Sequence, residues 1–317
     1  MTALTSPVPV AESQLASAVL MVRPVRFESN PMTAESNRFQ GRSDAAPVDQ
    51  QFAAEREFDD LVRELRANDI EVIVVEDTPE PHTPDSIFPN NWVSFHADGR
   101  VVLYPMEARN RRAERRMDIL DAINRPISEI VDLTQHEDAG HFLEGTGSMV
   151  LDRVNRIAYA CLSSRTQLDP LGDFAQRMDY EVVAFDAVDR DGVPIYHTNV
   201  LMNVGEKLAV ICDEAIVKEE QRLAVWKQLE GTGHEVMSLS YDQLDAFAGN
   251  MLELRTAKGE RAVAMSERAY RSLTDEQRER LEHNGRLIVS NIDAIEDSAG
   301  GSVRCMLAEV HLNKADE

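Results

Sequence analysis

The chain has 317 residues, of which 43% are apolar, so it can fill the core of one large domain or of two ordinary ones. Its net charge of −23 repels phosphate groups, which disfavours nucleic acids and anionic membranes as partners. No basic start followed by an apolar stretch opens the chain, and no apolar run approaches the roughly 20 residues of a membrane-spanning helix. Cysteines without framework spacing indicate free thiols in a reducing compartment. We therefore expect a cytoplasmic protein.

The chain opens with mostly small and polar residues. We expect residues 1–18 to form a loose tail and residues 19–317 to form a single domain. A first helix is predicted where Phe52, Phe58 and Leu61 share one face at helical spacing. Five strand-like segments each follow a helix-like one, at intervals of 52 to 58 residues. Their centres are Val72, Ile130, Val182, Val236 and Ile288. A repeat of this length is typical of modular assembly.

Turn residues divide the segments ahead of the later helices into pairs of short strands. The clearest turn is Asp98-Gly99, a dipeptide that favours hairpins. The pairs lie within residues 91–104, 148–162, 200–211 and 251–265. The repeating unit is therefore strand, strand, helix, strand, and the fold class is α/β. The first unit lacks a clear hairpin, and we expect a C-terminal strand over residues 303–312 to complete it.

Five such units closed into a ring would bring the starts of the hairpins around one central pocket. Polar residues recur at these starts, although packing would favour apolar groups there. They are Asn90, Asn91, Glu144, His197, Asn199, Asn250 and Cys305. We therefore predict that the functional site lies in this pocket.

The most reactive of these candidates is Cys305, which follows Gly300 and Gly301 closely. Two glycines just ahead of a thiol let backbone and substrate approach. A nucleophilic cysteine also needs a base to draw off its proton, and His197 is the best candidate. The alternative is a buried structural cysteine, because free cysteine is among the most buried residue types.

Several motifs, in order along the chain from about Met21 to Leu312, resemble the guanidine-modifying superfamily. This group includes arginine deiminases, dimethylarginine hydrolases and amidinotransferases. Residues 84–91 (PDSIFPNN) resemble its Pro-Asp-Ser-Val-Phe-x-x-Asp segment. The other matching motifs are EGTG at 144–147, SSRT at 163–166, HTN at 197–199 and the glycine-rich loop before Cys305. The resemblance implies the pentein fold, a five-bladed α/β propeller of repeated ββαβ units around a central active site.

The resemblance also implies a role for each matching residue. Cys305 would be the nucleophile, His197 the general acid and base, and Glu144 a partner of the histidine or of the substrate nitrogens. Arg165 falls where the family binds the substrate's α-carboxylate, which suits a bidentate guanidinium. Asp85 falls where relatives contact the α-amino group.

Two further residues are candidates for substrate contact. Asn90 stands at the start of a predicted hairpin. Arg109 would meet a carboxylate, although charged residues at helix starts are usually only solvated.

The chain departs from the family pattern at Asn91 and Asn199, where the deiminases have carboxylates. A guanidinium stays cationic, and burying it without an anion is costly. A neutral ureido group presents donors and one acceptor, which asparagine matches. The sequence is also most similar to the citrulline-hydrolase branch. We therefore expect a hydrolase that converts citrulline and water to ornithine, ammonia and carbon dioxide through a covalent intermediate on Cys305.

Two alternatives stay open. The first is arginine deimination, dimethylarginine hydrolysis or amidino transfer. The second is a non-catalytic binding module, because the same fold occurs in a ribosome-associated translation factor. We expect an amino-acid substrate and no cofactor, and we leave open whether the chain forms a homo-oligomer. No metal site is expected either, because His136 and His141 flank Gly140 in a loop and would not share a helix face.

Overall fold

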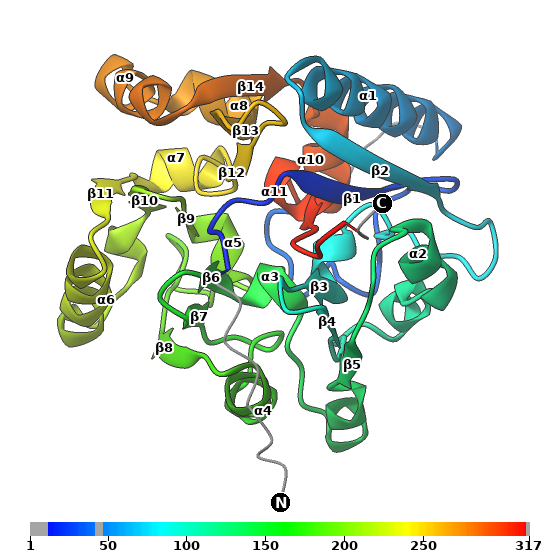
Figure 1. Cartoon of the computed structure of the whole chain (residues 1–317), viewed down its shortest axis with the longest axis horizontal. Coiled ribbons are helices and arrows are strands. Elements are labelled where there is room, and N and C mark those ends of the chain that lie inside the picture. The colour runs from blue at the N-terminus through cyan, green and yellow to red at the C-terminus, as the bar shows by residue number, and fades with distance from the viewer. Residues whose placement is uncertain (1–11, 42–46, 315–317) are drawn as a thin grey trace, which may run out of the picture.

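The protein is built from small three-stranded sheets. The computed structural model describes residues 12–41 and 47–314. Within these ranges the strands form five sheets of three strands each. The sheets surround the middle of the molecule, and the longer helices lie outside them (Figure 1). The predicted mixed α/β class is confirmed, although the described strands do not join into one closed sheet.

Four of the sheets are built from consecutive segments. Each contains an antiparallel hairpin whose second strand pairs in parallel with a third strand, which follows a helix. The second unit of the chain contains β3 (Val93–Phe95), β4 (Arg100–Leu103), α2 (Met117–Ala122) and β5 (Glu129–Asp132). The third contains β6 (Val150–Asp152), β7 (Ile157–Cys161), α4 (Leu168–Met178) and β8 (Glu181–Phe185). The fourth contains β9 (Met202–Val204), β10 (Leu208–Ile211), α6 (Glu219–Gly231) and β11 (Glu235–Ser238). The fifth contains β12 (Leu252–Arg255), β13 (Arg261–Ser266), α8 (Glu267–Ser272), α9 (Asp275–Asn284) and β14 (Arg286–Ser290).

The remaining sheet joins segments from both ends of the chain. β1 (Ala18–Arg23) pairs in parallel with β2 (Glu71–Glu76), and α1 (Pro47–Ala67) lies between them in the chain. β15 (Ala308–Glu309) adds to the other side of β1 in the antiparallel direction. The C-terminal strand therefore completes the first unit, as predicted.

Helix α1 packs through one apolar face, as the periodicity predicts. In α1, Phe58 and Leu61 are fully buried, whereas Phe52 is 65% exposed. The prediction that Phe52 belongs to the buried face is therefore wrong, because the buried apolar stripe of α1 begins only at Ala54.

Short helical turns carry the polar residues into the middle of the molecule. They are η1 (Pro89–Asn91), α3 (Gly145–Ser148), α5 (Thr198–Leu201) and α11 (Val303–Met306). η1 packs against α3 and α11, and α3 packs against α5. Cys305 therefore lies on a helical turn and not on the predicted strand over residues 303–312. The backbone N–H of Cys305 donates to Ser302 O at 3.0 Å, which closes this turn, and the strand is confined to Ala308–Glu309.

The segment ahead of β1 is bound to distant parts of the chain. Gln14 Nε2 donates to Leu151 O at 3.0 Å and to Val204 O at 2.8 Å, across 137 and 190 residues of sequence. Glu12 forms an ion pair with Arg153 at 2.8 Å. The predicted loose tail over residues 1–18 is therefore wrong for residues 12–18, and residues 1–11 lie outside the described residues.

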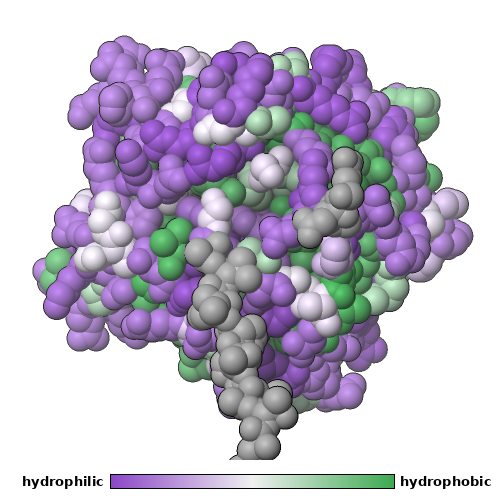
Figure 2. All heavy atoms as spheres, viewed as in Figure 1, coloured by the Kyte–Doolittle hydropathy of each residue, from purple (hydrophilic) through white to green (hydrophobic). Residues whose placement is uncertain are grey.

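The face of the molecule drawn in Figure 2 is mostly hydrophilic, which agrees with the net charge of −23. Across the described ranges, no helix combines the length and the apolar character that crossing a membrane requires.

Candidate active site

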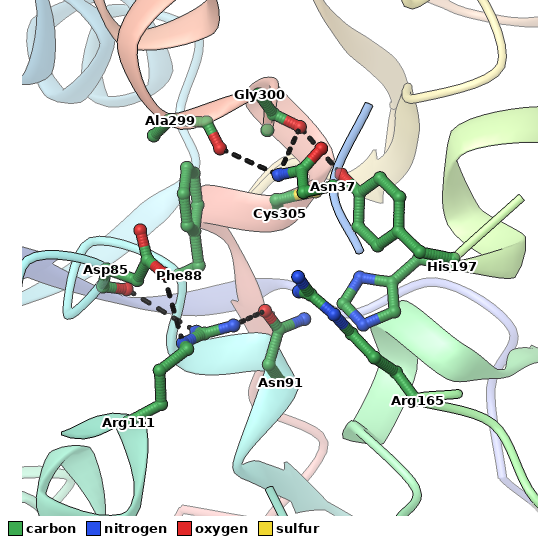
Figure 3. Close-up of a pocket in the computed structure, with 12 residues that line it drawn as sticks. Asn37, Asp85, Phe88, Asn91, Arg111, Arg165, His197, Ala299, Gly300 and Cys305 are labelled. Atoms are coloured by element: carbon green, nitrogen blue, oxygen red, sulfur yellow. Dashed lines mark hydrogen bonds and ion pairs between the residues drawn. The ribbon is translucent and has the colours of Figure 1, made fainter. Parts of the chain in front are cut away.

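A small cavity lies between the inner turns (Figure 3). It holds about 250 Å³ of empty space, including the part open to solvent. Its walls come from η1, α11, the residues around α5, the turn η2 (Arg109–Glu114) and the segment between β1 and α1. The lining residues are Asn37, Asp85, Phe88, Asn91, Arg111, Arg165, Tyr196, His197, Ala299, Gly300, Gly301 and Cys305. Convergent polar groups in a concave site are typical of small-molecule binding.

Cys305 presents its sulfur to this cavity from α11 and is 3% exposed. Two amide groups lie against the sulfur. Asn250 Nδ2 is 3.3 Å from Sγ, and Asn199 Nδ2 is 3.5 Å from it. The predicted Gly300 and Gly301 line the cavity next to the thiol. The sulfur is therefore reachable from the cavity and held among neutral donors.

His197 and Glu144 form a buried pair. His197 Nε2 lies 2.9 Å from Glu144 Oε2. Burial alone would raise the pKa of Glu144, but Arg165, the hydrogen bond from His197 and Arg111 hold this pKa well below its ordinary value. Burial lowers the pKa of His197 to about 4, although the bond to Glu144 acts in the opposite direction. The histidine is therefore neutral near pH 7, its Nε2–H donates to the carboxylate, and Nδ1 is left with a free lone pair.

Gly147 lets this pair and Asn91 come together. A Cβ at Gly147 would lie 2.5 Å from Asn91 Nδ2 and 2.8 Å from His197 Nδ1. No real side chain fits at such distances, so the second glycine of the EGTG motif allows η1, α3 and α5 to pack closely. The motif therefore positions the catalytic candidates through packing.

Arg165 lies on the cavity wall with its guanidinium partly satisfied by the protein. It is 3.5 Å from Glu144 and stacks over the Tyr196 ring at 4.9 Å. Arg165 Nη2 also donates to Ser36 Oγ at 2.7 Å and to Thr33 O at 3.3 Å. The segment between β1 and α1 therefore covers the arginine that sequence analysis assigned to the substrate carboxylate.

A second buried arginine, Arg111, was missed by sequence analysis. It forms a bidentate pair with Glu114, with both distances 2.9 Å, and its Nη1 donates to Asn91 Oδ1 at 2.9 Å. It also lies 3.6 Å from both Asp85 and Glu144. The three-residue spacing of Arg111 and Glu114 was the available signal, since such a pair can meet on one turn.

The structure does not bring Arg109 to the cavity. Arg109 is exposed, whereas Arg111 on the same turn is buried and lines the wall. The predicted position of Arg109 at the substrate is therefore wrong, because η2 turns Arg111, and not Arg109, toward the cavity.

The remaining candidates lie at different depths. Asp85 lines the cavity, and its Oδ2 accepts from Asn30 at 2.8 Å. Among the described residues, Asp85 Oδ1 and Asn199 Oδ1 are buried without a hydrogen-bond donor. Asn90 lies behind the wall, where its Oδ1 accepts from Asn91 Nδ2 at 3.1 Å. Asn90 therefore supports Asn91 and does not line the cavity.

The two histidines weighed as metal ligands are each paired with a carboxylate. His136 Nε2 is 3.0 Å from Asp173, and His141 Nδ1 is 2.9 Å from Asp169. Within residues 12–41 and 47–314, no group of three or more His, Cys, Asp or Glu side chains has the arrangement of a metal site.

Comparison with known proteins gives one family. A family model described as N,N dimethylarginine dimethylhydrolase, eukaryotic, matches residues 23–312. No curated protein sequence matches the chain.

Solved structures with the same fold are also found. The N-terminal domain of ArgZ, an arginine dihydrolase from the ornithine-ammonia cycle in cyanobacteria, was solved bound to substrate with a cysteine replaced by serine. It matches with a TM-score of 0.71 and 17% identity, over 93% of this chain and 99% of that domain. Full-length ArgZ matches with a TM-score of 0.70 and 18% identity, over 92% of this chain, which spans only 40% of that longer protein. A dimethylarginine dimethylaminohydrolase variant, solved as an adduct with S-methyl-L-thiocitrulline, matches with a TM-score of 0.64 and 14% identity, over 93% and 99% of the two chains. At these identities the likeness shows the fold.

Proposed function

Because the chain belongs to the family described as N,N dimethylarginine dimethylhydrolase, eukaryotic, within the guanidine-modifying pentein superfamily, we propose that it is a cysteine-dependent hydrolase acting on citrulline. The five sheets would be the blades of one pentein propeller domain. Cys305 would form the covalent intermediate, and the products would be ornithine, ammonia and carbon dioxide.

The charge balance beside the sulfur carries this proposal. The sulfur's neighbours are the amides of Asn199 and Asn250. The carboxylate that lies closest to the catalytic histidine, Glu144, is already paired with Arg165 and Arg111. With Asp85 assigned to the α-ammonium group, no other carboxylate with an unpartnered oxygen lines the described cavity wall, so a guanidinium substrate would be buried without a free anion, which is unfavourable. A neutral ureido group avoids this cost.

Asn91 strengthens the same argument. Its Oδ1 accepts from Arg111 at 2.9 Å, so the wall at this position presents a protein guanidinium where the deiminases of this superfamily have a carboxylate. A second guanidinium from a substrate would be repelled by Arg111. The carbonyl oxygen of a ureido group would instead find a donor there.

The amino-acid end of the substrate would have two partners of opposite charge to its own groups, Arg165 for the α-carboxylate and Asp85 for the α-ammonium group. Arg165 has five N–H donors, and Ser36 Oγ, Thr33 O and Glu144 accept from four of them in the described structure. The fifth, on Nη1, would donate to the α-carboxylate. Asp85 has one carboxylate oxygen without a hydrogen-bond donor among the described residues, which suits an α-ammonium group. These two groups would bind the carboxylate and ammonium ends of a zwitterionic amino acid and leave its side chain to reach Cys305.

The reaction then follows from the neutral state of His197. Its imidazole takes the thiol proton, and the Cys305 thiolate adds to the ureido carbon. The imidazolium returns this proton to the leaving nitrogen, so ammonia departs and an S-thiocarbamate remains on Cys305. Neutral His197 next takes a proton from water, which adds to the thiocarbamate and expels the thiolate. The released carbamate decomposes to ornithine and carbon dioxide.

Dimethylarginine hydrolysis is the second candidate, because the matching family model carries that description. It needs an anion for the substrate guanidinium, which only Asp85 offers with an unpartnered oxygen on the described cavity wall. The non-catalytic alternative would leave the grouping of Cys305, His197 and Glu144 without a purpose.

Parallel assays of the purified protein with citrulline, arginine and dimethylarginine test the proposal. We expect ornithine and ammonia from citrulline and much slower turnover of both guanidines. Formation of citrulline from arginine or dimethylarginine at a higher rate than the hydrolysis of citrulline would overturn the substrate assignment. If none of the three compounds is turned over and citrulline does not protect Cys305 from alkylation, the results would support the non-catalytic binding module.

A further inference from the structure

The fifth unit of the fold contributes an asparagine to the nucleophile. Asn250 comes two residues before β12, is fully buried, and belongs to the loop that follows α7 (Tyr241–Asp245). Its Nδ2 is closer to Cys305 Sγ, at 3.3 Å, than that of Asn199, at 3.5 Å. We propose that Asn250 is a catalytic residue that stabilises the Cys305 thiolate through its amide N–H.

The orientation of the Asn250 amide is fixed by a second bond. Nδ2 also donates to the backbone carbonyl of Asn199 at 2.9 Å. A carbonyl oxygen accepts hydrogen bonds and cannot donate them, so the NH₂ group and not the oxygen must face Asn199 O. The second N–H of the same group is then free to donate to the sulfur. Donation from N–H to a thiolate is a charge-assisted hydrogen bond and is stronger than donation to a neutral thiol.

The oxygen of the Asn250 amide can accept a hydrogen bond from the Cys305 thiol. Asn250 Oδ1 lies 3.7 Å from Cys305 Sγ, within the reach of an S–H donor. One side chain can therefore accept from the thiol before its proton leaves and donate to the thiolate afterwards. Since little rearrangement is needed between the two states, the ionised form gains stabilisation at the moment it is formed.

The loop that carries Asn250 is docked firmly on the turn that carries the histidine. A Cβ at Gly249 would lie 2.4 Å from Val200 O, so only glycine permits this approach to α5. The backbone N–H of Asn250 also donates to Phe247 O at 2.9 Å. Asn250 thus holds a fixed position between α5, which follows His197, and α11, which carries Cys305.

Alkylation of Cys305 by iodoacetamide at one fixed pH, followed by mass spectrometry of the peptides, tests this inference without any substrate. Burial raises the pKa of Cys161 and of Cys212 to about 12 each, so these thiols provide slow internal references. In Asn250→Leu, which keeps the volume and loses the donor, we expect Cys305 labelling and kcat for citrulline to fall at least about tenfold, with KM within about twofold. KM should hold because Asn250 is not part of the cavity wall. Asn284→Leu, which changes a buried asparagine at the end of α9, is the matched control.

The inference rests on Cys305 being the nucleophile of the proposed function, and the experiment separates the two. Labelling of wild-type Cys305 no faster than that of Cys161 would refute the nucleophile itself. Fast labelling of Cys305 in the wild type and an equal rate in folded Asn250→Leu would refute only the role of Asn250. Should Asn250→Leu fail to fold, the isosteric Asn250→Asp decides the question. It lacks the donor and adds an anion, so a wild-type labelling rate in that variant would equally overturn the inference.

Discussion

The site has an amide side, behind Cys305, and a charged side, around Arg111 and Arg165, and the polar groups of the two sides are satisfied in opposite ways. Around Cys305, neutral amides from Asn199 and Asn250 contact the sulfur. Around Arg111 and Arg165, charged groups pair with one another, with Glu144 shared by both arginines at 3.6 and 3.5 Å. Under the proposed function, the charged side would orient a zwitterion, and the sulfur on the amide side would receive an uncharged reacting group. Under the proposal, specificity would depend on where charge lies relative to the sulfur.

Removal of the sulfur should have the largest effect on the amide side. We expect Cys305→Ala to lower kcat by more than about a thousandfold, because no covalent intermediate can form. Steady-state turnover and a thermal melt would measure this, with Cys212→Ala as the control that keeps activity. Turnover within tenfold of wild type in a folded Cys305→Ala protein would contradict the mechanism.

Removal of the shared anion should unbalance the charged side. In Glu144→Gln, two buried guanidinium groups lose their common partner, and His197 loses its charged acceptor. We expect a loss of stability of about 3–5 kcal/mol and a fall in kcat of about a hundredfold or more. Denaturant titration and turnover measure the two effects. Glu267, which is partly exposed and pairs with the exposed Arg271, should cost less than about 1 kcal/mol when changed to Gln. Equal costs for the two variants would contradict the role given to Glu144.

A negative charge at position 91, where the amide side meets the charged side, should lower the activity toward citrulline. In Asn91→Asp, Arg111 would pair with the new carboxylate, so we expect citrulline kcat/KM to fall about 10- to 100-fold with little gain for arginine. Adding Arg111→Met should free that carboxylate and raise the ratio of arginine to citrulline kcat/KM. Burial already raises the pKa of Glu114, so this group can take up a proton once Arg111 is gone. A large gain for arginine in the single variant would show that Arg111 does not neutralise position 91.

The pH dependence tests the neutral histidine. Since burial lowers the pKa of His197 to about 4, kcat/KM should stay level below pH 6.5 and fall only near pH 4. The free energy of unfolding should also fall as the pH falls, because an unfolded histidine binds its proton near pH 6.5 and the folded one does not. The contribution of His197 to stability is therefore complete above about pH 6.5 and is lost as the pH falls through about 4. Rates from pH 4 to 8, with circular dichroism at each point, would check this. A midpoint near 6.5 in folded protein would be evidence against it.

The smallest effect on activity is expected from a change at Ser36, which lies between β1 and α1 and contacts Arg165. Ser36→Ala removes hydrogen bonds of 2.7 and 3.1 Å that orient the guanidinium. We expect KM for citrulline to rise a fewfold and kcat to stay the same. Ser128→Ala, whose hydroxyl bonds Asp98 O outside the cavity, is the control. A change in kcat without a change in KM would argue that Ser36 acts on the chemical step and not on substrate binding.

The repeating unit could be predicted from sequence because it is a local pattern. Alternating apolar residues and turn signals such as Asp98-Gly99 set the hairpins, and β15 was found because the first unit lacked a strand. The four-residue turns were not predicted, since a segment as short as Val303–Met306 has no periodicity. Their inward direction depends on packing such as that around Gly147, which only tertiary structure shows.

The dependence on tertiary packing also explains which site residues could be predicted from sequence. Cys305, His197 and Glu144 carry motif signals. In the structure Cys305 and His197 line one cavity, and His197 pairs with Glu144. Arg111 and Arg109 are two residues apart, and the sequence alone does not say which of them turns inward. Asn250 is among the polar residues predicted around the pocket, but its contacts with Asn199 O and with Cys305 Sγ depend on tertiary packing.

The most direct test of the account is a competition between substrates in one tube. Equal concentrations of citrulline and arginine are mixed with the purified protein, and the loss of each is followed, so that the ratio of the two rates gives the ratio of kcat/KM. The amide surroundings of the sulfur predict that citrulline disappears first and that arginine is consumed at least about a hundredfold more slowly. Faster consumption of arginine would contradict the claim that this site selects an uncharged substrate.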